Sequence, residues 1–209
     1  MWIVKGEKKE VEIYMLPREK LAVIDKAVDS IAKKLVYRDG VFVETDSIIQ
    51  AVSDYTKTKI SFSYASFSTL IPKTANYGAI MCVTKWNEGA HKQHAQIILN
   101  DEKDLKFRRF SLVHELGHLA TGEYNLEEKE NQFMLCAHIQ YNITAIPEKV
   151  YQDDPFMEAE EIANVFALKI LLPTERFAKK IFELKDISAV ADSFGVTEDA
   201  VCSRSLLGL

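Results

Sequence analysis

The hydrophobic pattern of the chain changes period several times, and each period predicts a different element. Residues 1–16 mix apolar and charged side chains in near alternation, which indicates a short strand or an arm. From residue 17 to 35, after a proline that can open a helix, apolar residues recur every three or four positions. Asp39-Gly40 ends that amphipathic helix. Thr45 or Asp46 can cap a second, shorter one.

A sheet is predicted next along the chain. Between residues 60 and 65, apolar and small polar side chains alternate with a period of two, which is typical of a half-buried strand. Residues 77–84 and 94–100 predict a second and a third strand, separated by a turn at 86–89. The second half of the chain is mainly helical in pattern. We expect a helix in 126–137 and loop after it.

Residues 108–118 carry the most informative spacing in the chain. They spell Arg-Arg-Phe-Ser-Leu-Val-His-Glu-Leu-Gly-His and predict a helix. His114 and His118 lie one turn apart on it, so both imidazoles can reach one metal ion. Glu115 lies beside that pair, where a carboxylate can hydrogen-bond a metal-bound water. Because the opposite side is apolar, this is the arrangement of a zinc hydrolase. The alternative is two core histidines that happen to share a face.

A catalytic zinc ion usually has a third protein ligand. The best region for it is a helix predicted around residues 158–172, which is apolar on nearly all sides beyond its first turn. Glu160 can ligate zinc from this helix, and Asn164, one turn further, can orient a ligand imidazole. Alternatively, Glu158, Glu160 and Glu161 form a solvated acidic first turn that favours the helix dipole. The spacing alone does not decide between these readings.

Three segments together carry a family resemblance. They are Arg109-Phe110-Ser-Leu-Val-His114-Glu115-Leu-Gly-His118, Glu160-x-x-Ala163-Asn164-x-Phe166-Ala167-x-x-x-Leu171-Leu172-Pro173 and Phe194-Gly195-Val196-Thr197-x-x-Ala200-Val201-x-x-Arg204. With these residues the chain resembles the ImmA/IrrE family of gluzincin-like metallopeptidases over about half its length, from Ile97 onward. The sequence departs from the family at Ile162, where many members carry a second Glu, and in a long insert between Gly122 and Pro155.

The resemblance implies a site and a fold. Zinc (Zn2+) would be held by His114, His118 and Glu160, with Glu115 as the general base. We expect an α+β, zincin-like metallopeptidase domain with a small mixed sheet, an HExxH active-site helix and a helix-turn-helix-like C-terminal tail. We divide the chain into an N-terminal arm and helix (1–40), the metallopeptidase domain (41–185) and the packed tail (186–209).

In gluzincins an edge strand beside the cleft can pair with an extended peptide. Here the third predicted strand or its neighbour would be that strand. The alternative is that either one is an ordinary core strand.

The resemblance also implies a function. We expect a zinc-dependent endopeptidase that cleaves a regulatory protein, such as a helix-turn-helix repressor in a phage, mobile-element or stress circuit. One alternative is a zinc-fold protein-binding or toxin-like module with little proteolytic activity. A transcriptional regulator is a weaker alternative. Its recognition helix would begin with Glu198-Asp199 after the cap Thr197 and would offer only Arg204 as a cation, whereas phosphate binding needs Lys and Arg. We therefore expect a packed tail and no nucleic-acid partner.

Composition and charge fit a cytoplasmic protein of this kind. Hydrophobic residues make up 47% and charged residues 27% of the 209 positions, as in ordinary globular proteins. The net charge of −5 gives no general attraction to nucleic acid. The three cysteines are odd in number and widely spaced, so we expect reduced thiols. The charged N-terminus argues against a secretory signal, and no apolar run approaches membrane-spanning length.

A few further residues invite chemical roles. His91 and His94 lie near a polar turn, but the better-spaced helical pair makes them poor zinc ligands. Arg108 and Arg109 can hold a carboxylate or a helix partner, or can form a surface salt bridge. The insert that borders the predicted cleft offers three tyrosines as oxyanion donors, and the sequence does not choose among them; these are Tyr124, Tyr141 and Tyr151.

Overall fold

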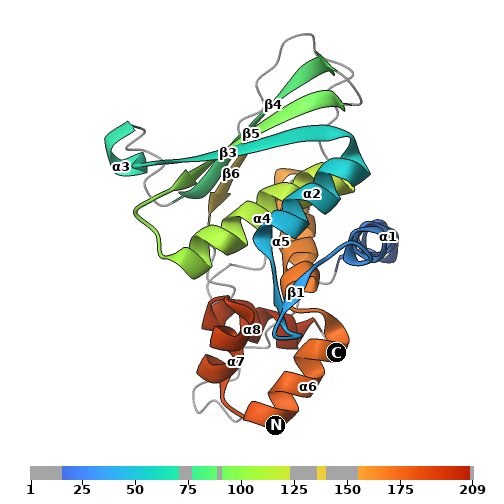
Figure 1. Ribbon diagram of the computed structural model, residues 1–209, viewed down its shortest axis with the longest axis vertical. Coiled ribbons are helices and arrows are strands. Elements are labelled where there is room, and N and C mark those ends of the chain that lie inside the picture. Colours follow the sequence, from blue (N-terminus) through green and yellow to red (C-terminus); the bar gives the residue numbers. More distant parts are fainter. Residues whose placement is uncertain (1–15, 71–76, 89–90, 123–135, 140–154, 208–209) are drawn as a thin grey trace.

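The fold combines a small sheet with helices, so the predicted α+β class is confirmed (Figure 1). A computed structural model describes residues 16–70, 77–88, 91–122, 136–139 and 155–207. In chain order these residues form α1 (Arg18–Ala32), β1 (Tyr37–Arg38), β2 (Phe42–Val43), α2 (Thr45–Thr56), β3 (Thr58–Ala65), α3 (Phe67–Leu70), β4 (Tyr77–Glu88), β5 (His91–Asn100), α4 (Leu105–Thr121), β6 (Cys136–Ile139), α5 (Pro155–Leu171), α6 (Thr174–Leu184), α7 (Ile187–Phe194) and α8 (Glu198–Leu206). The sheet lies at one end of the molecule and α6–α8 at the other, with α4 and α5 between them (Figure 1).

The main sheet has the strand order β3-β5-β4-β6. β3 runs parallel to β5, whereas β4 is antiparallel to both of its neighbours. Every second residue of β4 and β5 is buried toward the helices, as at Met81 and Ile97, which face each other across the ladder. The third predicted strand, β5, therefore lies inside the sheet, so for this strand the core-strand alternative is the correct one. Its neighbour β3 occupies the edge.

Two local predictions in the sheet region are wrong. Residues 86–88 of the expected turn at 86–89 belong to a strand, because β4 continues to Glu88. Glu88 pairs with His91 of β5 beyond an irregularity in the register. The two strands of this hairpin are thus paired as far as Glu88, which includes polar residues that suggested a turn. The helix expected in 126–137 is contradicted at its end, where Cys136 and Ala137 belong to β6. The remainder of that segment lies outside the described residues, as does the arm predicted in 1–16 apart from Leu16.

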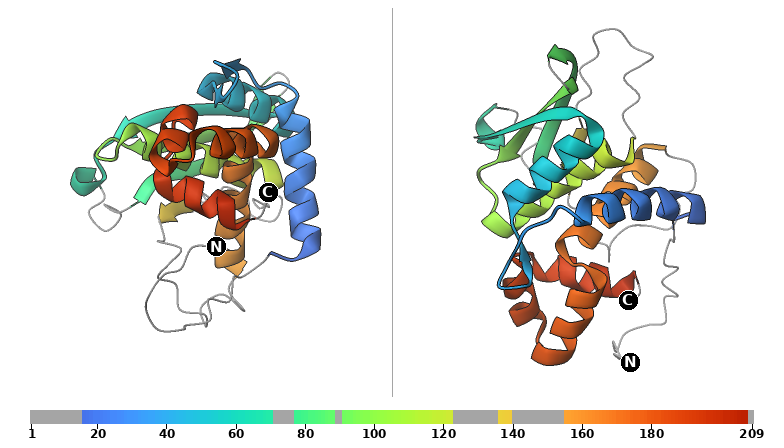
Figure 2. Two further views of the ribbon diagram at one scale, coloured as in Figure 1. Left: turned by 90° about the horizontal axis from the view of Figure 1, so that it is seen from below. Right: turned by 45° about the vertical axis from the view of Figure 1, so that its right-hand side comes forward.

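The N-terminal helices cover the core much as the periodicity predicted. α1 follows Pro17 and buries Ile24, Ala27 and Ile31, and it packs across α5 (Figure 2). α2 begins one residue earlier than expected. Its N-cap position is held by Glu44, which makes no side-chain capping bond, so neither predicted cap is correct. The hydroxyl of Thr45 instead accepts a hydrogen bond from Arg109 Nε of α4 (3.4 Å).

α4 is the central helix, and it is buried on all sides from Ser111 to Ala120. Asp104 caps its start by accepting a hydrogen bond from the Phe107 amide (2.9 Å), and Gly122 ends it in a left-handed conformation (φ 76°). On the sheet side the contact is close, since a Cβ at Gly78 of β4 would lie 2.1 Å from Ser111 Oγ. α4 is therefore held between the sheet and α5.

The C-terminal helices pack on this core. Gly195 (φ 63°) ends α7, and Thr197 caps α8, as predicted, by accepting a hydrogen bond from the Ala200 amide (3.3 Å). Phe194 and Val201 belong to the same hydrophobic core as residues of the sheet and of α1. Within the described part of the chain, no helix is long and apolar enough to cross a membrane.

Candidate metal centre

α4 carries two histidines on one face, one turn apart. The rings of His114 and His118 meet edge to face with their centroids 4.8 Å apart, and their Nε2 atoms are separated by 3.1 Å. Both side chains are buried, which is uncommon for histidine without a partner. Two imidazole nitrogens thus point at the same small volume inside the protein.

α5 crosses α4 at Gly117, the residue that precedes His118. A Cβ at this glycine would lie 3.0 Å from the Ala163 carbonyl oxygen and 3.0 Å from the Phe166 ring. Such close approach of two helices needs a residue without a side chain at the crossing. The crossing brings Glu160, one turn before the contact on α5, to the histidine pair.

Glu160 completes a group of three side chains. Its two carboxylate oxygens lie 3.2 Å from His114 Nε2 and 3.3 Å from His118 Nε2. The ligand atoms of the three residues all lie within 4.8 Å of one another, and among the described residues this is the group of His, Cys, Asp and Glu that could hold a metal ion. The solvated-turn alternative applies to Glu158, which forms an ion pair with Lys20 of α1 (2.7 Å).

A neighbouring amide fixes the orientation of His114. Its Nδ1 lies 2.9 Å from Asn164 Oδ1, and since an amide oxygen can only accept, Nδ1 carries the proton and donates. Nε2 of this ring is then left with its lone pair directed at Glu160 and His118. Two imidazole nitrogens and one carboxylate form a donor set that suits zinc and related divalent ions. The residues present therefore fit a metal ion, and Asn164 has the orienting position that the sequence suggested.

The charges in the group favour the ligand forms of these side chains. Burial acts to raise the pKa of Glu160, but the imidazoles of His114 and His118 beside the carboxylate outweigh burial and hold that pKa well below its usual value. Burial lowers the pKa of His118, and Glu160 only partly opposes this effect. A carboxylate and neutral imidazoles are the forms that bind metals.

Glu115 lies next to this group and is in a different electrostatic state. It is fully buried, and neither carboxylate oxygen has a hydrogen-bond partner among the residues that the structure describes. Burial, and secondarily the charge of Glu160, raise its pKa well above 4.5. A buried carboxylate without partners has a high proton affinity, which is the property required of a general base or acid.

Other residues singled out in the sequence are placed elsewhere. His94 contacts Ser61 Oγ (2.8 Å) across the sheet and is not part of the group. The side chain of His91 and the three tyrosines of the insert are not among the described residues. Arg109 holds a helix partner rather than a carboxylate, because it donates to the Phe194 carbonyl at the end of α7 (2.6 Å).

Sequence reasoning missed the importance of Gly117. The signal was present, since glycine weakens a helix by about 1 kcal/mol relative to alanine and is rarely placed inside one without a packing reason. The contribution of Gly78, which makes room for Ser111, had no comparable signal because glycine is common near strands and turns.

An α+β fold in which two helices bring together a buried His-His-Glu group defines a protein suited to binding a metal ion. The chain belongs to the M78 peptidase family, because the family model described as the IrrE N-terminal-like domain matches residues 83–206, more than half of its length. This match confirms the resemblance inferred from the motifs. The search of curated proteins finds no match to the chain.

Proposed function

We propose that this protein is a zinc-dependent endopeptidase with a zincin-like catalytic centre on α4 and α5. The proposal is carried by one observation, the buried group of His114, His118 and Glu160 next to the unpartnered carboxylate of Glu115. Membership of a peptidase family supports peptide hydrolysis as the reaction. When bound, zinc supplies Lewis acidity, which polarises the scissile carbonyl and lowers the pKa of the attacking water.

The residues of the chain then have distinct roles. His114, His118 and Glu160 hold the ion. Asn164 Oδ1 accepts a hydrogen bond from Nδ1–H of His114, which keeps Nε2 of that ring free to ligate. Glu115 takes a proton from the water and passes it to the leaving amine. Burial favours this transfer, because Glu115 has no competing hydrogen-bond donor among the described residues and binds a proton more readily than an exposed carboxylate.

We infer that the substrate is a regulatory protein, such as a helix-turn-helix repressor, met in the cytoplasm. This inference rests on the family resemblance. A role in reading DNA through the C-terminal helices is not supported, because Arg204, the cation of α8, is only 2% exposed. Its guanidinium donates to the Leu172 carbonyl (3.1 Å) and to Thr174 Oγ1 (2.7 Å), so it stabilises the junction of α5 and α6 instead.

The test separates hydrolysis from metal binding. Glu115→Gln is expected to retain about one zinc per chain and to lose about 10²–10⁴-fold in turnover, the usual contribution of a general base. His114→Ala is expected to lose metal and turnover together. Glu158→Gln, on the surface of the same helix as Glu160, is the matched control and should retain both. Metal content is measured by mass spectrometry, and cleavage is followed on a repressor encoded near the gene.

If Glu115→Gln acts on the partner as well as the parent protein does, peptide hydrolysis is not the function. The binding-module alternative would then hold, with the metal group serving as structure. A stable complex of Glu115→Gln with the intact partner, absent with His114→Ala, would identify the substrate.

A further inference from the structure

β3 forms one edge of the sheet that the described residues build. It pairs only with β5 among the strands that the structure describes, over the full length from Thr58 to Ala65. In Figure 1 it is drawn in front of the other strands of the main sheet. Natural edge strands are usually protected by charges, prolines or bulges, because their unpaired backbone groups can bind another strand. β3 contains no proline, and Lys59 is its single charged residue.

The two faces of β3 differ sharply in chemistry. On the outer face of the sheet, Ser61 hydrogen-bonds with His94 and with Gln96 (2.6 Å). On the helix side, Ile60 packs against the core, whereas Phe62 and Tyr64 are 39% and 55% exposed.

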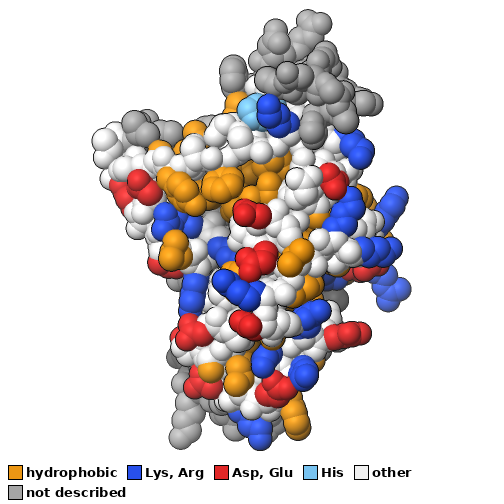
Figure 3. All heavy atoms as spheres, in the orientation of Figure 1, with side chains coloured by type: hydrophobic (Ala, Val, Ile, Leu, Met, Phe, Trp, Pro, Cys, Tyr) orange, Lys and Arg blue, Asp and Glu red, His pale blue; other side chains and the backbone are white. Residues whose placement is uncertain are grey.

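The exposed aromatic pair is ordered. The rings of Phe62 and Tyr64 meet edge to face at 6.0 Å, and the guanidinium of Arg108 of α4 lies 5.2 Å from the centre of the Tyr64 ring. Hydrophobic side chains gather on the surface just below this strand (Figure 3). Within the described part of the chain, the edge of β3 therefore combines backbone that has no partner strand with exposed aromatic side chains, the two features that a docking strand requires.

We propose that the occupant of this edge is β3 of a second copy of the chain, paired antiparallel about a two-fold axis through Phe62. The register follows from symmetry. Residues directly opposite each other in an antiparallel pair point to the same face, so the position numbers of paired residues must add to an even number. Centring the pair on Phe62 satisfies this condition and brings the exposed aromatic side chains of the two copies into contact.

The resulting cross-strand pairs match in character. Phe62 faces its own equivalent, Tyr64 faces Ile60, and on the other side of the sheet Ser61 faces Ser63. Lys59 faces Ala65, so the one charge on the strand does not oppose a like charge. Both exposed aromatic side chains become buried, and the sheet continues from one copy into the other. Because the axis is perpendicular to the sheet, both copies of α4, with their metal-ligand groups, lie on the same face of the joined sheet.

The oligomeric state of the full-length protein tests this proposal. Sedimentation velocity over a range of concentrations is expected to give a reversible dimer. Phe62→Lys combined with Tyr64→Lys is expected to weaken the dimer by about a hundredfold or more, since it places like charges opposite each other at the centre of an interface. Phe182→Lys is the matched control, because Phe182 on α6 is more exposed (78%) and lies far from β3 in the fold (Figure 1).

Hydrogen exchange provides a second measurement on the unmodified chain. Amides of β3 that point outward should become more protected as concentration rises, whereas amides of α6 should not. A protein that stays monomeric at every concentration would overturn the proposal. So would a dimer that persists in the double variant, with native circular dichroism and metal content, or one that Phe182→Lys dissociates.

Discussion

Glu115, the proposed general base, illustrates at the scale of a residue how a buried carboxylate can lower the stability of the protein that carries it. A buried polar group without a partner destabilises a fold by about 1–3 kcal/mol. The protein carries such a group at a fully buried position of its central helix. Strain of this kind is concentrated at functional sites, and the surrounding fold compensates for it.

The free energy of unfolding of the metal-free protein should therefore depend on Glu115 and on pH. The pKa of Glu115 is raised in the folded state, so its favourable, protonated form contributes fully below its unfolded value of 4.5 and is lost as pH rises. In the metal-free protein, Glu115→Gln is expected to raise the free energy of unfolding by about 1–3 kcal/mol at pH 8. This gain should vanish as pH falls below 4.5, the pKa of the glutamate in the unfolded chain. Urea denaturation from pH 4 to 8 measures it. A gain that is constant with pH would contradict the prediction.

Sequence alone could identify some residues of the site but not all of them. His114, Glu115 and His118 follow from one helical spacing, because a single helix fixes their mutual positions. Glu160 could not be separated from Glu158 and Glu161 by spacing. Its selection depends on the angle and height at which α5 crosses α4, a tertiary quantity, and the family resemblance was needed to choose it.

At the scale of elements, the site depends on how closely two helices approach. Glycine at position 117 lets α5 lie against the backbone of α4, so that a carboxylate on one helix reaches imidazoles on the other. The helices themselves were predictable from periodicity. The strand order was not, because the sequence does not record that β5 inserts between β3 and β4. That insertion makes β5 a core strand and leaves its neighbour β3 at the edge.

Gly117→Ala tests the close approach. Alanine favours a helix by about 1 kcal/mol over glycine, so helix propensity alone predicts a more stable protein. The added Cβ would lie 3.0 Å from the Ala163 carbonyl oxygen, and relief of this contact must move α5. We expect destabilisation by about 1–3 kcal/mol, as for overpacked cores, together with weaker zinc binding.

The control for this variant is Gly122→Ala at the end of the same helix. No atom lies within 4 Å of a Cβ there, but the left-handed backbone is unfavourable for alanine. It should lose some stability and retain its zinc affinity. Competition with a chromophoric chelator measures the affinity of both variants, and equal affinities would show that the crossing does not set the site.

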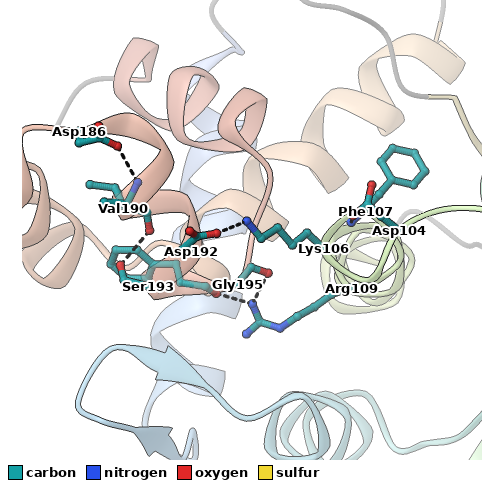
Figure 4. Close-up of polar contacts among 11 residues, drawn as sticks. Asp104, Lys106, Phe107, Arg109, Asp186, Val190, Asp192, Ser193 and Gly195 are labelled. Atoms are coloured by element: carbon teal, nitrogen blue, oxygen red, sulfur yellow. Dashed lines mark hydrogen bonds and ion pairs between the residues drawn. The ribbon is translucent and has the colours of Figure 1, made fainter.

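At the scale of the whole molecule, α4 also connects the metal centre to the C-terminal helices. Lys106 and Arg109 extend from α4 toward the end of α7 (Figure 4). Arg109 donates to the carbonyls of Phe194 (2.6 Å) and Gly195 (3.0 Å), and to that of Val43 in β2 (2.6 Å). Its guanidinium also stacks on the Phe42 ring at 4.1 Å. One side chain thus joins three segments that are distant in sequence.

The two cations of this junction should differ strongly in their contributions to stability. Burial lowers the pKa of Arg109 to about 10, whereas the ion pair of Lys106 with Asp192 (2.5 Å) is partly exposed to solvent. Arg109→Lys keeps the charge but removes the planar fork that serves the carbonyls, and should destabilise the protein by about 2–4 kcal/mol. Lys106→Ala should lower stability by less than about 1 kcal/mol, as for other exposed pairs.

Calorimetry and hydrogen exchange together distinguish the ways in which Arg109→Lys could act. Because Phe194 and Val201 belong to the common core, the C-terminal helices should melt in the same transition as the sheet and α4 in the parent protein. In Arg109→Lys, amides of α7 and α8 should exchange faster while those of the sheet remain protected, as expected when a docked unit opens locally. Lys106→Ala should leave both patterns unchanged. Equal effects of the two substitutions would mean that the apolar contacts, rather than Arg109, hold the C-terminal helices on α4.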